Sequence, residues 1–155
     1  LAQMASISAQ HGCRLVLENE SVCWGNTGME AAYIVREVGQ SNFSLLWDPG
    51  NSARAGSREP FPGEYAGLRD LVEHVHLKNF HPDRNMWSLM ADGAIDWYGQ
   101  FAALEADRYT GYLVLETHVK SRPDGLAMRD GLDGLESNSL DNLDYVRAHL
   151  QRLAD

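Results

Sequence analysis

Cysteine is scarce in this chain, with only Cys13 and Cys23 among its 155 residues. Two thiols at this spacing make neither a disulfide framework nor a zinc motif, because both need further cysteines or histidines at characteristic separations. We therefore expect both thiols to be reduced, as in a cytoplasmic protein.

Long apolar runs are also missing. No stretch approaches the ~20 apolar residues that cross a bilayer, and no secretory signal peptide is recognisable. We therefore expect no contact with a membrane. The chain opens with Leu1 rather than Met, and residues 1–10 already have a helical pattern. The start is expected to be a cut inside a longer protein.

Basic residues are outnumbered, since 13 Lys and Arg stand against 22 Asp and Glu, for a formal net charge of -9. An acidic surface repels the phosphate backbone, so we expect no nucleic-acid partner. An acidic balance also fits a cluster of carboxylates that a cation would neutralise.

Four short apolar runs rich in Val and Leu recur along the chain. They cover residues 13–18, 43–48, 74–79 and 112–116. Runs of about six residues are too short for stable helices and favour strands. Their near-continuous hydrophobicity is typical of strands buried on both faces, as in parallel sheets.

Helical patterns separate these runs and follow the last of them. They cover residues 1–10, 27–39, 62–71, 97–107 and 140–153. Thr27 and Glu30 form a capping box, Gly39 is a good C-cap, and Asp96 and Ser139 are N-cap candidates. Residues 120–138 are rich in Gly, Asp and Ser and are expected to form a loop. The alternation predicts an α/β fold of right-handed βαβ units, with residues 1–155 as a single domain.

Each strand-like run ends in a side chain that can bind a metal. These side chains are Glu18, Asp48, His76 and Glu116. Because the carboxyl ends of parallel strands share one edge of a sheet, we expect the four to converge. Three carboxylates and one imidazole suit Mn²⁺ or Mg²⁺, with Zn²⁺ and Co²⁺ as alternatives. Burying this much charge without a cation would be costly.

The motifs around these residues resemble a known family. They are Leu-Val-Leu-Glu-Asn, Trp-Asp-Pro-Gly-Asn, His-Val-His-Leu-Lys-Asn, Gly-Ala-Ile-Asp-Trp and Gly-Tyr-Leu-Val-Leu-Glu-Thr-His. Together they resemble the latter half of the xylose-isomerase-like TIM-barrel superfamily, and most closely its sugar phosphate isomerase/epimerase branch. The resemblance implies that the chain is the C-terminal half of a (β/α)8 barrel, with the four runs as strands five to eight. It also implies that Glu18, Asp48, His76 and Glu116 are the metal ligands.

Several positions differ from the pattern of these relatives. Asn51 stands where they often carry His, Asn79 where they often carry Asp, and Trp24 where ketose 3-epimerases carry a substrate-binding Glu. Arg84 lies in the loop where relatives place a substrate-contacting Arg. We therefore expect Arg84, Asn51 and Trp24 to contact the substrate.

The favoured function is a divalent-metal-dependent isomerase or epimerase of a sugar, sugar phosphate or related polyol ketone, acting through an enediolate. Glu18 and Glu116 would exchange the proton on the carbon next to the carbonyl. An apurinic-site endonuclease shares the barrel but needs three zinc ions and further His ligands, and this chain has Asn51 and Asn85 at two of those places. The third alternative is a non-catalytic or incomplete barrel fragment that binds a sugar. Four strands leave two open edges, so we expect an N-terminal half-barrel or a second copy to complete the sheet.

Overall fold

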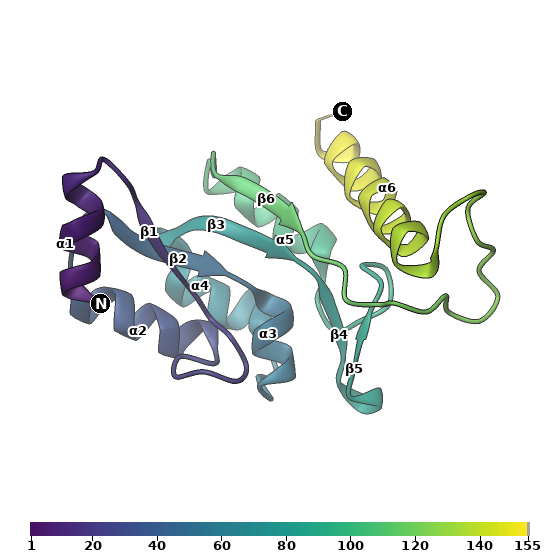
Figure 1. Ribbon diagram of the computed structural model, residues 1–155, viewed down its shortest axis with the longest axis horizontal. Coiled ribbons are helices and arrows are strands. Elements are labelled where there is room, and N and C mark those ends of the chain that lie inside the picture. The colour runs from purple at the N-terminus through teal and green to yellow at the C-terminus, as the bar shows by residue number, and fades with distance from the viewer. Residues whose placement is uncertain (155) are drawn as a thin grey trace.

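The computed structural model describes residues 1–154 and contains one four-stranded parallel sheet (Figure 1). The strands lie in the order of the sequence: β1 (Leu15–Glu18), β2 (Phe43–Trp47), β3 (Val72–Leu77) and β6 (Tyr112–Leu115). All neighbouring pairs are parallel. Each strand lies within or overlaps one of the apolar runs, which confirms the predicted sheet.

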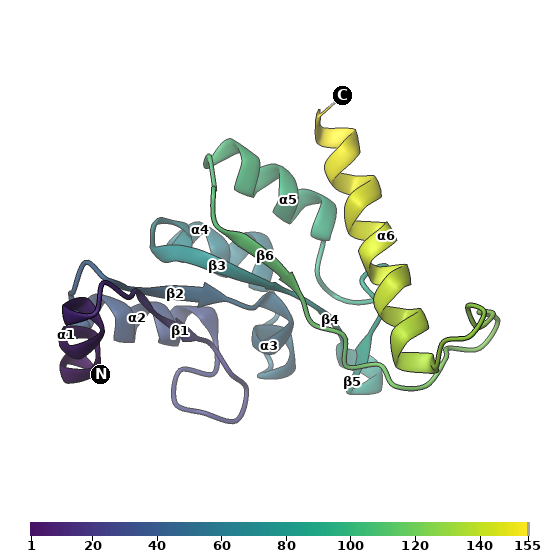
Figure 2. The same cartoon turned by 45° about the horizontal axis from the view of Figure 1, so that its top comes forward.

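Helices lie behind this sheet and along its ends (Figure 1, Figure 2). They are α1 (Ala2–Gln10), α2 (Gly28–Val38), α3 (Pro49–Arg54), α4 (Tyr65–Leu68), α5 (Trp97–Ala106) and α6 (Gly134–Ala154). In Figure 1 the strands pass in front of α2, α4 and α5, and Figure 2 shows α6 beside α5 at the β6 end. The other face is open, and Val16, Tyr112 and Val114 are exposed there. No helix within residues 1–154 is both long and apolar enough to cross a bilayer.

The core lies between the sheet and its helices and is built largely from aromatic and aliphatic side chains. Trp47, Leu68, Trp97 and Phe101 are among its fully buried members. The indole nitrogen of Trp47 donates a hydrogen bond to Gln100 at 3.0 Å. Its polar atom is thus satisfied inside the core, and Trp47 packs between the sheet and its helices.

Two helix starts agree with their local signals. Thr27 accepts a hydrogen bond from the Glu30 amide, and α2 ends at Gly39 in the left-handed conformation. Asp96 accepts a hydrogen bond from the Gly99 amide at the start of α5. Side-chain acceptors at these positions satisfy amides that have no partner within the helix.

The last helix starts earlier than predicted, at Gly134, and Ser139 does not cap it. Asp133 accepts a hydrogen bond from the Glu136 amide at 2.8 Å, and Glu136 accepts one from the Asp133 amide at 2.9 Å. This reciprocal pair satisfies two free amides at once, which makes it the stronger start. Ser139 lies inside the helix, where its hydroxyl donates to the Leu135 carbonyl.

The region after β2 and the region after β3 also differ from expectation. The helix expected over residues 62–71 is reduced to α4, between a π-helical turn at Pro60–Glu64 and a 3-10 turn at Arg69–Leu71. After β3 a small antiparallel hairpin forms, with β4 (Asn79–His81) and β5 (Met86–Ser88) joined by the turn Pro82–Arg84. The hairpin lies at the carboxyl end of the sheet (Figure 1).

Candidate metal centre

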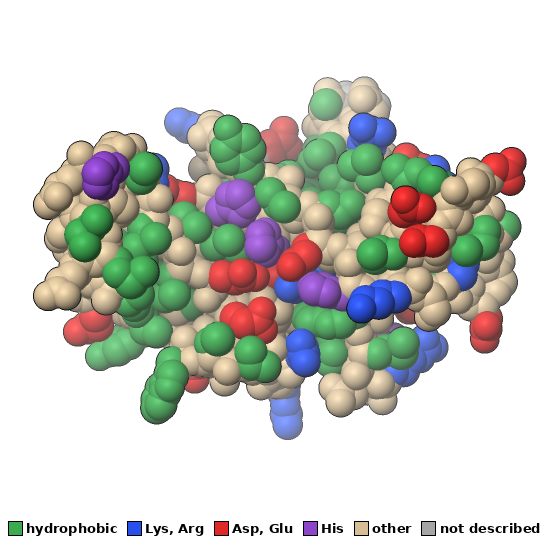
Figure 3. All heavy atoms as spheres, in the orientation of Figure 1, with side chains coloured by type: hydrophobic (Ala, Val, Ile, Leu, Met, Phe, Trp, Pro, Cys, Tyr) green, Lys and Arg blue, Asp and Glu red, His purple; other side chains and the backbone are tan. Residues whose placement is uncertain are grey.

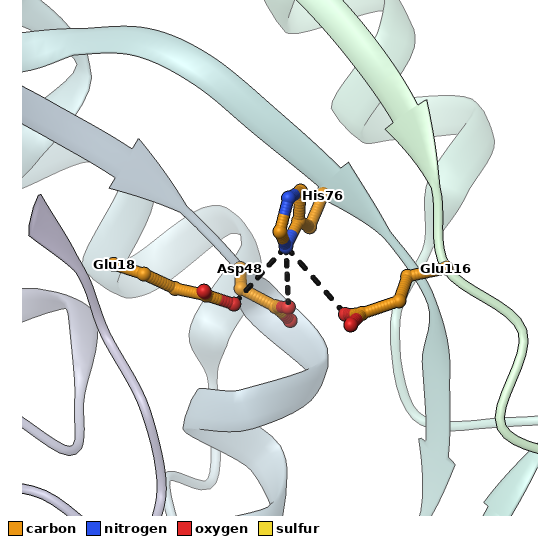
Figure 4. A group of neighbouring side chains, drawn as sticks. All are labelled: Glu18, Asp48, His76 and Glu116. Atoms are coloured by element: carbon orange, nitrogen blue, oxygen red, sulfur yellow. Dashed lines mark hydrogen bonds and ion pairs between the residues drawn. The ribbon is translucent and has the colours of Figure 1, made fainter. Parts of the chain in front are cut away.

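Four side chains from four different strands meet at the carboxyl edge of the sheet (Figure 4). Glu18 ends β1, Asp48 follows β2, His76 lies near the end of β3, and Glu116 follows β6. One donor atom from each lies within 4.8 Å of all the others. In Figure 3 acidic and histidine side chains gather in the middle of the open face. The arrangement follows from parallel strands that end at the same level.

The imidazole of His76 stands at the centre of this group. Its Nδ1 lies 3.0 Å from Glu18 Oε1, 3.5 Å from Glu116 Oε2 and 3.8 Å from Asp48 Oδ2. The hydrogen bond with Glu18, helped by the nearby carboxylate charges, raises the pKa of His76 against the effect of burial. Three carboxylates around one nitrogen form a strongly negative pocket.

Asp48 is the most deeply placed carboxylate and is fully buried. Its Oδ1 caps α3 by accepting a hydrogen bond from the Asn51 amide at 2.9 Å. Its Oδ2 accepts no well-aligned hydrogen bond within residues 1–154. Burial raises the pKa of Asp48 to about 7, although the charge of Lys78 opposes the rise. This oxygen lies 2.9 Å from Lys78 Nζ. The fit to a divalent metal therefore rests on the donor set itself, three carboxylates and one imidazole with ligand atoms within 4.8 Å of one another.

Lys78 belongs to this centre, although the sequence reasoning passed over it. Its side chain is almost fully buried, with Nζ 2.9 Å from Asp48 Oδ2 and 2.5 Å from Glu116 Oε2. Burial alone would lower the pKa of Lys78, but the two carboxylates raise it. In return, the hydrogen bond and charge of Lys78 lower the pKa of Glu116 against the effect of burial. The sequence does contain a signal for this role. Residues two positions apart in a strand face the same side of the sheet, and Lys78 follows His76 by two positions.

Asn51 supports the carboxylates from behind. Its Nδ2 donates to Glu18 Oε1 at 3.1 Å and to the Asn19 carbonyl at 2.9 Å. Asn19 in turn donates to the Asp48 carbonyl and accepts from the Asp48 amide. Both amide side chains are fully buried. Asn51 therefore helps to hold Glu18 in place, and its contact with the substrate stays a prediction.

Trp24 and Arg84, the other two residues expected to contact substrate, lie outside the cluster. Trp24 is 96% exposed in the loop before α2. Arg84 lies in the β4–β5 turn, where its guanidinium is 3.7 Å from Asp92. Arg84 lines a cavity of about 720 Å³ that Trp87 also lines.

Trp87 links that cavity to the metal centre. The centroid of its ring lies 5.0 Å from Lys78 Nζ, and its ring stacks on His118 with centroids 5.0 Å apart. His118 Nε2 lies 3.5 Å from Glu116 Oε1.

Comparison with known proteins identifies the family. A family model described as a xylose isomerase-like TIM barrel matches residues 1–138. The chain belongs to this family. The match confirms the resemblance drawn from the strand-end motifs.

Individual relatives of this TIM-barrel family agree with the assignment. The chain is 33% identical over 69 residues to 3-dehydro-D-guloside 4-epimerase of Escherichia coli (strain K12), which covers 44% of this chain and 24% of the relative. A xylose isomerase domain protein from Planctomyces limnophilus superposes with a TM-score of 0.74 at 16% identity, covering 99% of this chain and 50% of the other. A xylose isomerase-like TIM barrel protein from Mycobacterium smegmatis in complex with magnesium superposes with a TM-score of 0.66 at 20% identity. The match covers 96% of this chain and 47% of the other.

The aligned region spans about a quarter of the E. coli epimerase. The chain spans about half of each of the two solved structures. Its four parallel strands with outer helices are thus part of the eight-stranded barrel of this family. Structural likeness below a quarter identity establishes the fold alone, and the chemistry has to be argued from the centre itself.

Proposed function

We propose that this chain carries the metal centre of a divalent-metal-dependent isomerase or epimerase that acts on a sugar or a sugar-like polyol ketone. The observation that carries the proposal is the convergence of Glu18, Asp48, His76 and Glu116 within 4.8 Å at the carboxyl edge of the sheet. The E. coli relative, a 3-dehydro-D-guloside 4-epimerase, supports a keto sugar as the substrate class. We propose Mn²⁺ or Mg²⁺ as the cation, with Zn²⁺ and Co²⁺ as alternatives.

The cation would be held by these four residues and would supply a Lewis acid for neighbouring carbonyl and hydroxyl oxygens of the sugar. Glu18 and Glu116 come from the two outer strands of the sheet and flank His76 on opposite sides (Figure 4). Carboxylates on opposite sides of a substrate carbon can remove a proton from one face and return one to the other, which inverts that carbon.

Glu116 is the better candidate for the base. Lys78 donates a hydrogen bond to it at 2.5 Å and keeps its pKa below the ordinary value, so the carboxylate is ionised at neutral pH. Glu18 accepts from Asn51 and faces His76 at 3.0 Å, which fixes its carboxyl group toward the same centre. We propose Glu18 as the partner acid, which returns the proton on the opposite side.

For the distal part of the substrate we propose contact with Arg84. It lines the 720 Å³ cavity with Trp87 and Ser88, and a guanidinium there suits a phosphate or a carboxylate as well as hydroxyl groups. Asn51 would act on the substrate through Glu18. A contact from Trp24 requires the exposed loop before α2 to close over the centre.

The endonuclease alternative is not supported by the geometry. Asn51, which stands at a place where those enzymes need His, directs its amide nitrogen to Glu18, and an amide is a poorer zinc ligand than imidazole. We retain a small-molecule substrate and no nucleic acid. We also retain the proposed cytoplasmic location, which is consistent with the unpaired thiols of Cys13 and Cys23.

We further propose that the four strands are strands five to eight of the barrel. The open face carries exposed Val16, Tyr112 and Val114, which a barrel interior would bury. Either upstream strands or a second copy of this half would cover it. The 155-residue chain produced alone is therefore expected to self-associate, and sedimentation velocity at micromolar concentration should show a dimer or larger species. A well-folded monomer at low concentration would contradict this.

A substrate screen tests the proposed function directly. The metal-free protein is loaded in turn with Mn²⁺, Mg²⁺, Co²⁺ or Zn²⁺ and incubated with ketoses, aldoses, inosoles, 3-keto glycosides and their phosphates in deuterated water. We expect deuterium uptake at the carbon next to the carbonyl for at least one substrate, dependent on metal. Exchange that persists without metal would exclude the proposed centre. Sugar binding without any exchange would favour the non-catalytic alternative.

A further inference from the structure

Lys78 places a positive charge at the carboxylates that the proposed function assigns to a divalent cation. Its Nζ lies 2.9 Å from Asp48 Oδ2 and 2.5 Å from Glu116 Oε2. These are the same oxygens that face His76 Nδ1, at 3.8 Å and 3.5 Å. A metal held by Asp48, His76 and Glu116 would therefore need the atoms that the ammonium now contacts.

The ammonium also balances charge in this centre. Glu18, Asp48 and Glu116 bring three negative charges, and a single lysine side chain neutralises one of them. A divalent cation would neutralise the other two, but it would then lie within a few ångströms of a like charge. Two cations at that separation repel each other in a site of low dielectric constant.

The ammonium also lies over an aromatic ring. The ring of Trp87 is 5.0 Å from Nζ, a distance at which an aromatic face attracts a cation. Four methylene groups and rotatable bonds let the lysine head move while its stem stays buried. Trp87 would therefore keep an attraction for the ammonium if a metal displaced it from the carboxylates.

We propose that Lys78 is an internal counter-ion that holds Asp48 and Glu116 in the metal-free centre and competes with the divalent cation for them. This inference rests on the proposed metal centre. It predicts that Lys78 weakens metal binding while it stabilises the protein that has no metal. The alternative is that Lys78 only orients the carboxylates for the metal. In that case, loss of Lys78 should weaken metal binding.

Titration calorimetry of the intact protein with Mn²⁺ distinguishes the two roles. In Lys78→Met we expect Mn²⁺ to bind at least about tenfold more tightly than in the unsubstituted protein, because a like charge is removed. The metal-free variant should melt at a lower temperature, because two carboxylates lose their counter-ion. Lys78→Gln, which keeps a hydrogen-bond donor without the charge, should also bind more tightly and serves if the methionine variant does not fold.

Arg54→Met is the matched control. The Arg54 guanidinium lies 5.2 Å from the centre of the same Trp87 ring, and within residues 1–154 it makes no ion pair with the three carboxylates of the centre. Its Mn²⁺ affinity should be unchanged. Equal or weaker Mn²⁺ binding in both lysine variants would overturn the competition while leaving the metal centre standing. Absence of Mn²⁺ binding in every form of the protein would overturn both.

Discussion

Replacing Glu116 by glutamine is expected to slow proton exchange at the carbon next to the substrate carbonyl by roughly 10²–10⁴-fold, the scale for loss of a general acid or base. Glutamine keeps the size of the side chain and one oxygen that can face a metal, so part of the metal affinity should survive. It cannot accept a proton at neutral pH. The measurement is deuterium exchange into an accepted sugar at saturating metal.

Two companion variants separate a chemical role from other effects. Glu73→Gln alters an exposed carboxylate near the start of β3 that pairs with Arg14, far from the carboxyl edge. It should leave exchange unchanged and cost at most about 1 kcal/mol of stability. His76→Asn should lower metal affinity and be partly rescued by excess metal. If Glu116→Gln keeps near-normal turnover, Glu116 is only a ligand or a structural carboxylate, and the paired-glutamate mechanism is wrong.

Replacing Asp48 by asparagine is expected to remove the stabilisation that metal gives to the fold. A ligand that binds only the folded state adds about 2.7 kcal/mol at a concentration of 100 times its Kd. Thermal or urea unfolding with and without Mn²⁺ measures this gain. In the unsubstituted protein, the gain in stability from metal should approach that value. In Asp48→Asn the gain should be small, because the metal affinity should fall. Losing a residue that only supports a ligand typically lowers metal affinity roughly 10–100-fold, and losing the ligand itself should lower it further.

The asparagine variant is informative because it preserves the local structure. Its side-chain oxygen can still cap α3 through the Asn51 amide, which Asp48 now does at 2.9 Å. In the metal-free variant a fully buried carboxylate becomes neutral, but the buried Lys78 ammonium loses one of its two carboxylate partners. These effects oppose each other, so the stability should lie close to that of the unsubstituted protein. A metal-induced gain that survives in Asp48→Asn would show that the cation binds elsewhere.

The sheet and its ligand edge could be predicted because their signals are local. Each strand is a short apolar run that ends at a polar residue, and parallel strands bring their ends to one edge whatever the details of packing. The capping pairs of α2 and α5 are equally local. The start of α6 was missed although Asp133 and Glu136 form the same kind of pair, because they lie in a stretch whose composition reads as loop.

The hairpin of β4 and β5 was missed for a different reason. Its strands have three residues each, too few to show a periodic pattern, and it is held by cross-strand pairing such as Phe80 with Trp87. This hairpin places Trp87 beside Lys78 and brings both Trp87 and Arg84 to the lining of the cavity. The surroundings of the centre therefore depend on pairing that local sequence does not reveal.

The sequence by itself determined the family, the parallel sheet and the four residues at its carboxyl edge, because strand polarity and residue alternation act within a few positions of the chain. Only the tertiary structure decided how these residues are supported. Lys78 meets Glu116 across 38 positions, and Asn51 meets Glu18 across 33. Contacts of this kind depend on how the strands align and how the side chains are buried, and the charge and hydrogen bonding of the centre are set there.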